Sequence, residues 1–347
     1  MQDNYISRKK PSYPITDKLK KYLKRHERDV EISITYDDLL RFSGGIEIYD
    51  KDDNDTLWLS VYYNEFEREE INQAIKRIYS KLHYDGKDDI AKNLVVESID
   101  FCTFGNSKPF RIKMKSLLNQ NYTYFYIKQA DASRVYGLEL EELLSPNNIN
   151  FIYHNDTLIE EHIIGIPGDM YIKDRLDQAP KSSKSQIAKE FVKFNERCFI
   201  RLLGDMRSYN YVFVLSHDFD RIQYRLRAID FDQQSFEGAV NIYKPQFFKE
   251  NFSLVKLSSQ ILSKESIQQY IIEERSAIAR RAISEYDRLY TLIDCMKNDS
   301  ISLPKHIEKL KMSLFTLTHD VNFKHANNMG DVLKASIDFV IRNYKSV

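Results

Sequence analysis

The stretch "RLLGDMRSYNYVFVL", residues 201–215, places an acidic side chain just past a glycine, at the junction of two apolar segments. Asp205 follows the glycine, and Asn210 stands five residues further on, where an apolar run begins that predicts a buried strand. Both residue types are common in turns, so the spacing alone leaves a plain turn and a functional pair open. Asp88 and Asn93 share the same spacing, which shows that the surrounding segments must decide.

Length and charge limit the class of protein. A chain of 347 residues is long for a single core and predicts two or three domains of ordinary size. Lys plus Arg and Asp plus Glu both number 51, so the net charge is zero and argues against a nucleic acid partner. The basic stretch at residues 8–25 is interpreted as the solvated face of a short helix, which has an apolar side at Leu19, Tyr22 and Leu23.

Cysteine usage and hydropathy bear on the compartment. The three cysteines, Cys102, Cys198 and Cys295, are far apart and odd in number, which favours a reducing compartment over a disulfide scaffold. No apolar run approaches membrane-spanning length, and the N-terminal segment is polar. We therefore expect a cytoplasmic protein without a membrane partner.

Residues 1–93 alternate short elements and predict a small α+β domain. The pattern indicates a basic helix near residues 16–27 and a helix at about 65–83 whose apolar residues share one face. Between them, "VEISITY", "GIEIYD" and "TLWLSVYY" predict strands. If the protein has a protein partner, we expect this domain to contact it.

From residue 94 the pattern becomes strand after strand. "LVVESIDFCTF", "FRIKMKSL" and "YTYFYIK" are separated by turn residues and predict a meander. The segment "DASRVYGLELEELLSP" predicts a helix, and two further strands follow in "INFIYHN" and "TLIEEHIIG". After "IPGD" the chain turns helical, and residues 251–347 predict several amphipathic helices.

This order of parts resembles the protein kinase-like fold, and is closest to its aminoglycoside and small-metabolite phosphotransferase branch. The resemblance covers residues 94 to about 300. It implies a two-lobed α+β protein with a β-meander N-lobe at 94–168 and a helical C-lobe at 169–347 that includes C-terminal helices. The domain at 1–93 would precede both lobes.

The resemblance gives roles to residues of the N-lobe. Lys128, which ends the third strand of the meander, matches the lysine that binds ATP phosphates. Its alternative is a solvent-facing lysine at a strand end. Glu139 on the following helix is chosen as its partner over Glu141 and Glu142, because Glu139 shares a face with apolar residues one turn away.

The opening stretch matches the catalytic loop of these phosphotransferases, which commonly reads His-Gly-Asp, although Leu203 stands in place of the His. The match implies that Asp205 orients and deprotonates the acceptor hydroxyl and that Asn210 holds Mg²⁺. Arg207 occupies the position of a basic residue that steadies the transferred phosphoryl group in many kinases, but a surface arginine fits equally well.

A second anchor is "YRLRAIDFDQQSFEG", an apolar strand that ends in Asp230 and is followed by Phe231 and Asp232. Taken alone, this triplet is most often a turn. It resembles the metal-binding triplet of kinases, with Asp232 where protein kinases have glycine, and the resemblance assigns Mg²⁺ binding to Asp230 and Asp232.

The nucleotide loop departs most from the family. "FGNSKPF" has one glycine where many kinases have three. Gly105, Asn106 and Ser107 could present backbone N–H groups to phosphate, but a plain hairpin turn explains each of them as well. The resemblance also places the hinge, whose backbone would bind adenine, at residues 161–163, which are Glu161, His162 and Ile163.

The sequence therefore predicts an ATP- and Mg²⁺-dependent phosphotransferase that acts on a hydroxyl of a small molecule or a protein. An alternative is a catalytically inactive, kinase-like module that binds nucleotide or recruits a partner. A third interpretation is an interaction protein with an accidental resemblance, in which Lys128, Asp205 and Asp230 would not share one site.

Overall fold

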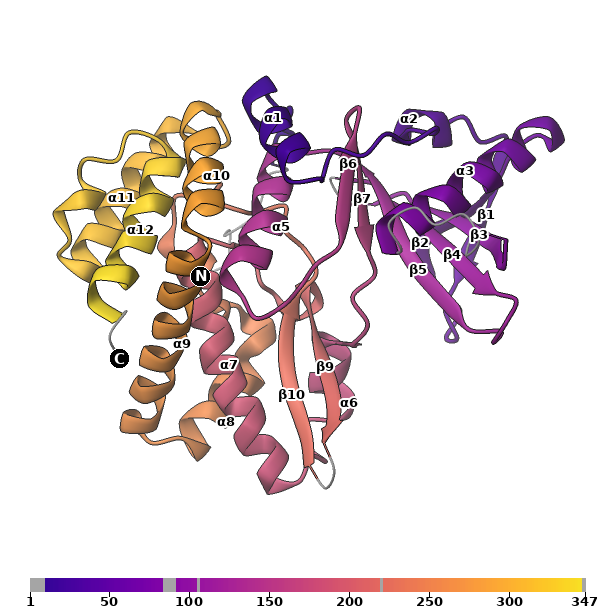
Figure 1. Ribbon diagram of the computed structural model, residues 1–347. Coiled ribbons are helices and arrows are strands. Elements are labelled where there is room, and N and C mark those ends of the chain that lie inside the picture. The colour runs from indigo at the N-terminus through magenta and orange to yellow at the C-terminus, as the bar shows by residue number, and fades with distance from the viewer. Residues whose placement is uncertain (1–9, 84–91, 105–106, 219–220, 345–347) are drawn as a thin grey trace. The chain divides into compact units, whose positions relative to one another are not determined.

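The computed structural model describes residues 10–83, 92–104, 107–218 and 221–344. The chain divides into two compact units. The sheet unit comprises the described residues of 8–131 and 149–162, and the helical unit those of 132–148 and 163–347. The protein is thus an α+β protein, and Figure 1 labels its elements.

The sheet unit is built on a seven-stranded antiparallel sheet in the order β1-β2-β3-β4-β5-β7-β6. Strand β5 lies between β4 and β7, so it has neighbours on both sides. The strands are β1 (Gly44–Tyr49), β2 (Asp55–Tyr62), β3 (Leu94–Cys102), β4 (Phe110–Ser116), β5 (Tyr122–Gln129), β6 (Phe151–His154) and β7 (Thr157–Glu161).

The sheet has one apolar face because alternate residues of a strand point to opposite sides. Phe110, Ile112 and Met114 of β4 are fully buried on this face. They share a core with α3 (Glu65–His83), which lies along the sheet in Figure 1 and buries Ile75 and Ile78. The amphipathic helix predicted at 65–83 is confirmed, and it covers this face.

Two short helices complete the sheet unit. Helix α1 (Asp17–Arg25) buries Leu19, Tyr22 and Leu23, as its sequence pattern predicted. Helix α2 (Tyr36–Leu39) begins within the segment "VEISITY", which does not form the predicted strand. Thr35 accepts a hydrogen bond from Asp38 and donates one to it, and this capping box starts a helix where a strand was expected.

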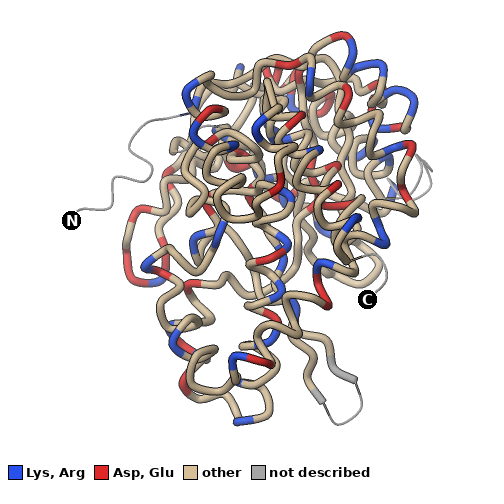
Figure 2. Tube along the Cα trace, turned by 90° about the vertical axis from the view of Figure 1, so that its left-hand side faces the viewer, with Lys and Arg blue, Asp and Glu red and all other residues tan. Residues whose placement is uncertain are grey.

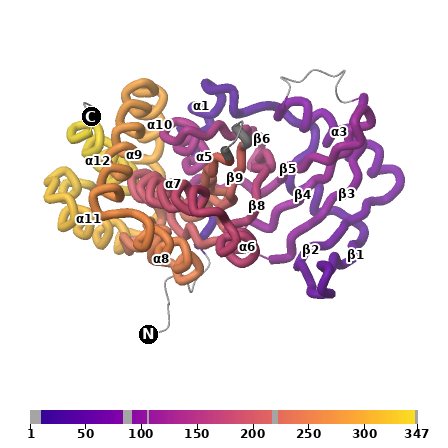
Figure 3. Tube along the Cα trace, turned by 90° about the horizontal axis from the view of Figure 1, so that it is seen from below, coloured from indigo at the N-terminus to yellow at the C-terminus, as the bar shows by residue number. Residues whose placement is uncertain are grey.

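The helical unit is centred on α7 (Lys181–Arg201). This helix packs against α8, α9, α12 and strand β10, and Figure 3 shows α8 and α9 beside it. The α-helices are α5 (Ala132–Leu144), α6 (Gly168–Asp174), α7, α8 (Phe252–Ile261), α9 (Lys264–Ser284), α10 (Tyr286–Asn298), α11 (Pro304–Thr318) and α12 (Met329–Tyr344). This unit also holds a small sheet in the order β10-β9-β8. Its strands are β8 (Ile166–Pro167), β9 (Tyr211–Asp218) and β10 (Arg221–Ala228). The 3₁₀ helices include η1 (Ser208–Asn210) and η2 (Val240–Tyr243).

Helix α5 belongs to the helical unit, although it follows β5 directly in sequence. Nearly all of its residues are buried. The Tyr136 hydroxyl donates to Asp299 at 2.6 Å, and Glu141 forms a buried ion pair with Arg201 of α7. These contacts fix α5 to α7 and to the segment after α10.

The structural division differs from the predicted domains. β2 pairs with β3 across the predicted boundary at residues 93/94, so residues 1–93 contribute strands to the same sheet. The predicted N-lobe at 94–168 gives α5 to the helical unit, and the chain passes between units at 162/163. Charges of both signs are interspersed along the whole trace, as Figure 2 shows and as the zero net charge suggests.

Truncation of Ile75 to alanine tests whether α3 and the sheet share one core. Ile75 is fully buried, so we expect Ile75→Ala to lower the free energy of unfolding by about 2–5 kcal/mol. Ile46→Ala is the matched control, because that side chain is 69% exposed on β1 and its truncation should change stability little. Chemical denaturation measures both. Equal losses for the two variants would contradict the assigned core.

Candidate functional site

The loop around Asp205 begins at the end of α7. Leu202 ends the helix in the left-handed conformation, with φ 56°. The N–H of Gly204 then donates to the Gln233 carbonyl at 3.2 Å, and a Cβ at Gly204 would lie 2.9 Å from the Ile242 side chain. Glycine is therefore required by close packing. Asp205 follows with φ 58°, a strained conformation for a residue with a side chain.

Asn210 ties this loop to the segment after β10. Its side-chain Nδ2 donates to the Asp205 carbonyl at 2.8 Å, and its own carbonyl accepts from the N–H of Ile229 at 3.0 Å. Asp230 comes directly after Ile229 in sequence. The structure thus brings Asp205, Asn210 and Asp230 together within the helical unit, as the sequence predicted.

Asp205 is mostly buried and lies among charged groups. Burial, together with the charges of Asp230 and Glu250, raises the pKa of its carboxyl to about 7, although the charge and hydrogen bond of Arg207 oppose the shift. The Arg207 Nε donates to Asp205 at 2.9 Å and its Nη1 donates to Glu250 at 2.7 Å. Arg207 is thus a partner of Asp205 and not a detached surface arginine.

Asp230 and Asp232 both contact one cation, Arg134, that the sequence did not indicate. The Arg134 Nη1 of α5 lies 3.0 Å from Oδ1 of Asp230 and 2.7 Å from Oδ1 of Asp232. The N–H of Asp232 also donates to Asp230 Oδ1 at 3.0 Å. The Arg134 side chain is only 3% exposed. No local sequence signal marks this contact, which joins residues 96 and 98 positions apart.

The side-chain oxygens of Asp230, Asp232 and Asn210 are ligands of the type that a hard cation prefers. Two carboxylates and an amide oxygen are ligands that Mg²⁺ accepts. The hydrogen bond from Asn210 Nδ2 to the Asp205 carbonyl turns the side-chain Oδ1 of Asn210 away from that carbonyl. Within the described residues, no group of three or more His, Cys, Asp and Glu side chains is placed to hold a metal. Asp230, Asp232 and the amide oxygen of Asn210 would supply only part of the coordination shell of a magnesium ion, and phosphate oxygens or water would supply the rest.

Lys128 lies in the sheet unit, on the polar face of β5. Its Nζ pairs with Glu160 of β7 at 2.8 Å, and both side chains are less than 10% exposed. The ammonium also lies 5.4 Å from the ring centroid of Tyr126. Lys128 is therefore a buried lysine with an acidic partner, and it is not a solvent-facing residue at the end of the strand.

Glu139, the predicted partner of Lys128, has a different partner within the helical unit. Its carboxylate, which is fully buried, accepts from Arg288 of α10 at 2.8 and 3.1 Å. The apolar face on which Glu139 was placed is the face that α10 covers. Glu141, the competing residue, pairs with Arg201. The structure thus gives both Lys128 and Glu139 partners that the sequence did not predict.

The polar face of the sheet carries a hollow of about 410 Å³. Arg111 of β4 lines this hollow. It forms an ion pair with Asp100 of β3 at 2.8 Å, and its guanidinium carbon lies 4.5 Å from the ring centroid of Trp58 of β2. His162 Nδ1 is 3.1 Å from the Tyr126 hydroxyl. Burial and the charge of Arg111 lower the pKa of His162. Lys113 and Tyr124 also line the hollow, so it combines cations with aromatic rings.

The predicted nucleotide loop and hinge are only partly described. Gly105 and Asn106 lie outside the described residues, and Ser107 is half-buried. The Glu161 N–H donates to the Asn150 carbonyl at 3.0 Å, so this N–H is already used in the sheet unit. Ile163 is buried and begins the next segment of the helical unit. The predicted hinge coincides with the point at which the chain changes units.

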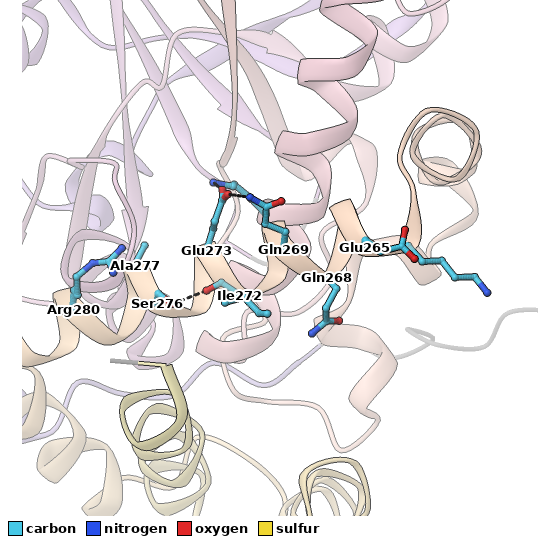
Figure 4. Close-up of a pocket in the computed structure, with 10 residues that line it drawn as sticks. Glu265, Gln268, Gln269, Ile272, Glu273, Ser276, Ala277 and Arg280 are labelled. Carbon is cyan, nitrogen blue, oxygen red and sulfur yellow. Dashed lines mark hydrogen bonds and ion pairs between the residues drawn. The ribbon is translucent and has the colours of Figure 1, made fainter. Parts of the chain in front are cut away.

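A hollow of about 1000 Å³ lies elsewhere in the helical unit. It follows one face of α9, and Lys193 of α7 also lines it. Figure 4 shows its side chains along the helix, among them Gln269, Glu273 and Arg280. Its lining holds charges of both signs and none of the predicted site residues, so it gives no support to a site there.

Comparison of the chain with models of known protein families gives no match, and none of the curated proteins matches it. Of the helices in the residues that the structure describes, none has the length and apolar character needed to cross a membrane. The candidate site therefore rests on its own geometry.

The raised pKa of Asp205 predicts a pH-dependent cost to folding. The folded state holds the proton up to about pH 7, whereas an unfolded aspartate loses it near its ordinary value of 3.8, so ionisation between these values destabilises the fold. We expect Asp205→Asn to be more stable than the wild type by about 2 kcal/mol at pH 8, with the gain shrinking toward pH 4. This gain is about half of the free energy that corresponds to the full pKa shift, because the asparagine side chain also loses the ion pair with Arg207.

Urea denaturation at several pH values measures this difference. Asp174→Asn, at an exposed aspartate that ends α6, is the control and should show no such trend. A difference between Asp205→Asn and the wild type that stays constant across pH would contradict the assigned burial of Asp205.

Proposed function

We propose that the protein is a kinase-like phosphotransferase that uses ATP and Mg²⁺ to phosphorylate a hydroxyl of a small molecule or a protein. The observation that carries the proposal is the hydrogen-bonded link from Asp205 through Asn210 to Ile229 and Asp230. In kinases the catalytic Asp, the metal-binding Asn and the metal-binding Asp occur in this order, on a loop after a helix and at the end of a strand.

Asp205 is the proposed general base. A carboxyl whose pKa lies near 7 is matched to proton transfer at neutral pH, because it is partly ionised and still basic enough to accept a proton. Its position on a tightly packed loop limits its motion, which favours orientation of an acceptor hydroxyl. Arg207 holds one oxygen of Asp205 and extends to Glu250, so its proposed role is to position the base.

Asp230, Asp232 and the amide oxygen of Asn210 are the proposed ligands of Mg²⁺. The ion would neutralise phosphate oxygens of ATP when it is bound. Lys128 is the proposed phosphate anchor in the sheet unit, and the order of meander, helix and returning strands agrees with a two-lobed kinase-like fold. The cationic and aromatic hollow on the same face of the sheet offers surfaces that suit a nucleotide.

A second candidate function is a catalytically inactive, kinase-like module that binds nucleotide or recruits a protein partner. The observation that favours it is the pairing of Lys128 with Glu160 and of Glu139 with Arg288. Active protein kinases need an ion pair between the strand lysine and the helix glutamate. The residues at 1–93, which extend the sheet by two strands, would then present part of the recruiting surface.

Thermal denaturation with ATP, in the presence and absence of Mg²⁺, tests the proposal at its metal site. We expect ATP to raise the melting temperature of the wild type, and Mg²⁺ to increase that rise, because a ligand of the native state stabilises it. Asp230→Ala should lose the Mg²⁺-dependent part. Asp174→Ala, at an exposed aspartate of the same unit, should behave like the wild type.

A phosphotransfer assay with labelled ATP separates the two candidates. Asp205→Asn should lose roughly 10²–10⁴-fold in transfer rate if Asp205 is a general base. Its stabilisation by ATP and Mg²⁺ should stay intact. Stabilisation of the wild type by ATP without any phosphotransfer would favour the inactive module, and transfer by Asp205→Asn at the wild-type rate would contradict the role of Asp205 as general base. Absence of any response of the wild type to millimolar ATP would refute the phosphotransferase and the nucleotide-binding form of the second candidate.

A further inference from the structure

We infer that Arg134 is a fixed cation that takes the place of the second of the two metal ions that kinases bind, so that this site holds a single Mg²⁺. The inference rests on the proposed function. It assigns to α5 an electrostatic role at the metal site in addition to its role in packing.

The guanidinium occupies a position between the two carboxylates. Its Nη1 contacts Oδ1 of both Asp230 and Asp232, and its Nη2 lies 3.4 Å from the Ile229 carbonyl. A second metal ion that bridged the same two oxygens would have to displace this group, so the single Mg²⁺ would have to use the other oxygen of each carboxylate. Because the Arg134 side chain is almost fully buried, it is not an exposed side chain that swings freely into solvent.

Helix α5 holds Arg134 in place. One turn further along the helix, an added Cβ at Gly137 would lie 2.9 Å from Phe231 and 3.3 Å from Gln234. Phe231 stands between the two aspartates in sequence and is buried. The helix backbone therefore approaches the 230–234 segment closely, and the ion pair between Glu139 and Arg288 secures α5 from its other side.

The ion pairs of the cluster place fixed positive charge beside its carboxylates. Two guanidiniums each contact two carboxylates: Arg134 contacts Asp230 and Asp232, and Arg207 contacts Asp205 and Glu250. In kinases, metal ions supply the positive charge at the metal-binding Asp. Arg134 thus supplies, at a fixed position, positive charge that a second metal ion supplies elsewhere.

Counting bound Mn²⁺ by electron paramagnetic resonance tests the inference. The intact chain is titrated with Mn²⁺ in the presence of equimolar AMP-PNP, a non-hydrolysable ATP analogue. We expect about one Mn²⁺ per complex for the wild type and about two for Arg134→Gln, because the variant removes the guanidinium from the two carboxylates and with it one positive charge. Arg134→Lys retains a cation and should stay near one.

Two further variants serve as controls. Arg275→Gln removes a part-buried arginine of α9 from its ion pair with Glu196 of α7 and should leave the count unchanged. Arg134→Met, which keeps the length of the stem, replaces Arg134→Gln if circular dichroism shows that the latter is unfolded.

The possible results separate the inference from the proposed function. Two Mn²⁺ per wild-type complex, or one in every folded Arg134 variant, would overturn the inference and leave the phosphotransferase proposal standing. Failure of the wild type to retain any Mn²⁺ beyond that held by free AMP-PNP would remove the proposed function itself. A count that changes from one to two only when the cation at position 134 is removed supports both.

Discussion

The contact between α5 and the segment 229–234 is the constraint on which the candidate site depends. Asp230 and Asp232 are carboxylates of one short turn, and their mutual repulsion must be offset for both to stay ionised. Arg134 offsets it from α5, and the close approach at Gly137 lets the helix come near enough to do so. The hydrogen bond between Ile229 and Asn210 then transmits this placement to the Asp205 loop. The geometry of the site is therefore set by a helix that is distant in sequence.

Stability and the proposed function oppose each other at Asp205. Its left-handed backbone and its burial both cost free energy in the folded state. Close packing of Gly204 and the ion pair with Arg207 hold the residue in place despite this cost. A turn whose only purpose was to connect α7 with β9 would not need a buried carboxylate. The strain is thus a physical argument for function that is independent of any resemblance.

Local patterns in the sequence predicted the elements and the order of the site residues, but not their partners. Helix α3 was predictable because its apolar residues recur with helical spacing, whereas the strand-like segment 30–36 forms no strand and a capping box at Thr35 begins a short helix at its end. Asp205, Asn210 and Asp230 were predictable as a group because two short strands return the chain to the same loop. Arg288 lies 149 residues from Glu139, and no local rule reports such a pairing. The position of α5 in the helical unit was missed for the same reason.

The ion pairs on the polar face of the sheet bear on the proposed binding of a nucleotide. Lys128 and Arg111 are each paired with an acid on the same face of the sheet. A phosphate group would have to share these cations with Glu160 and Asp100. The affinity for a nucleotide would then rise with the metal ion, because the metal adds positive charge where the lysine and the arginine are already paired. An enhancement of ATP binding by Mg²⁺ is thus the form of recognition that these charges favour.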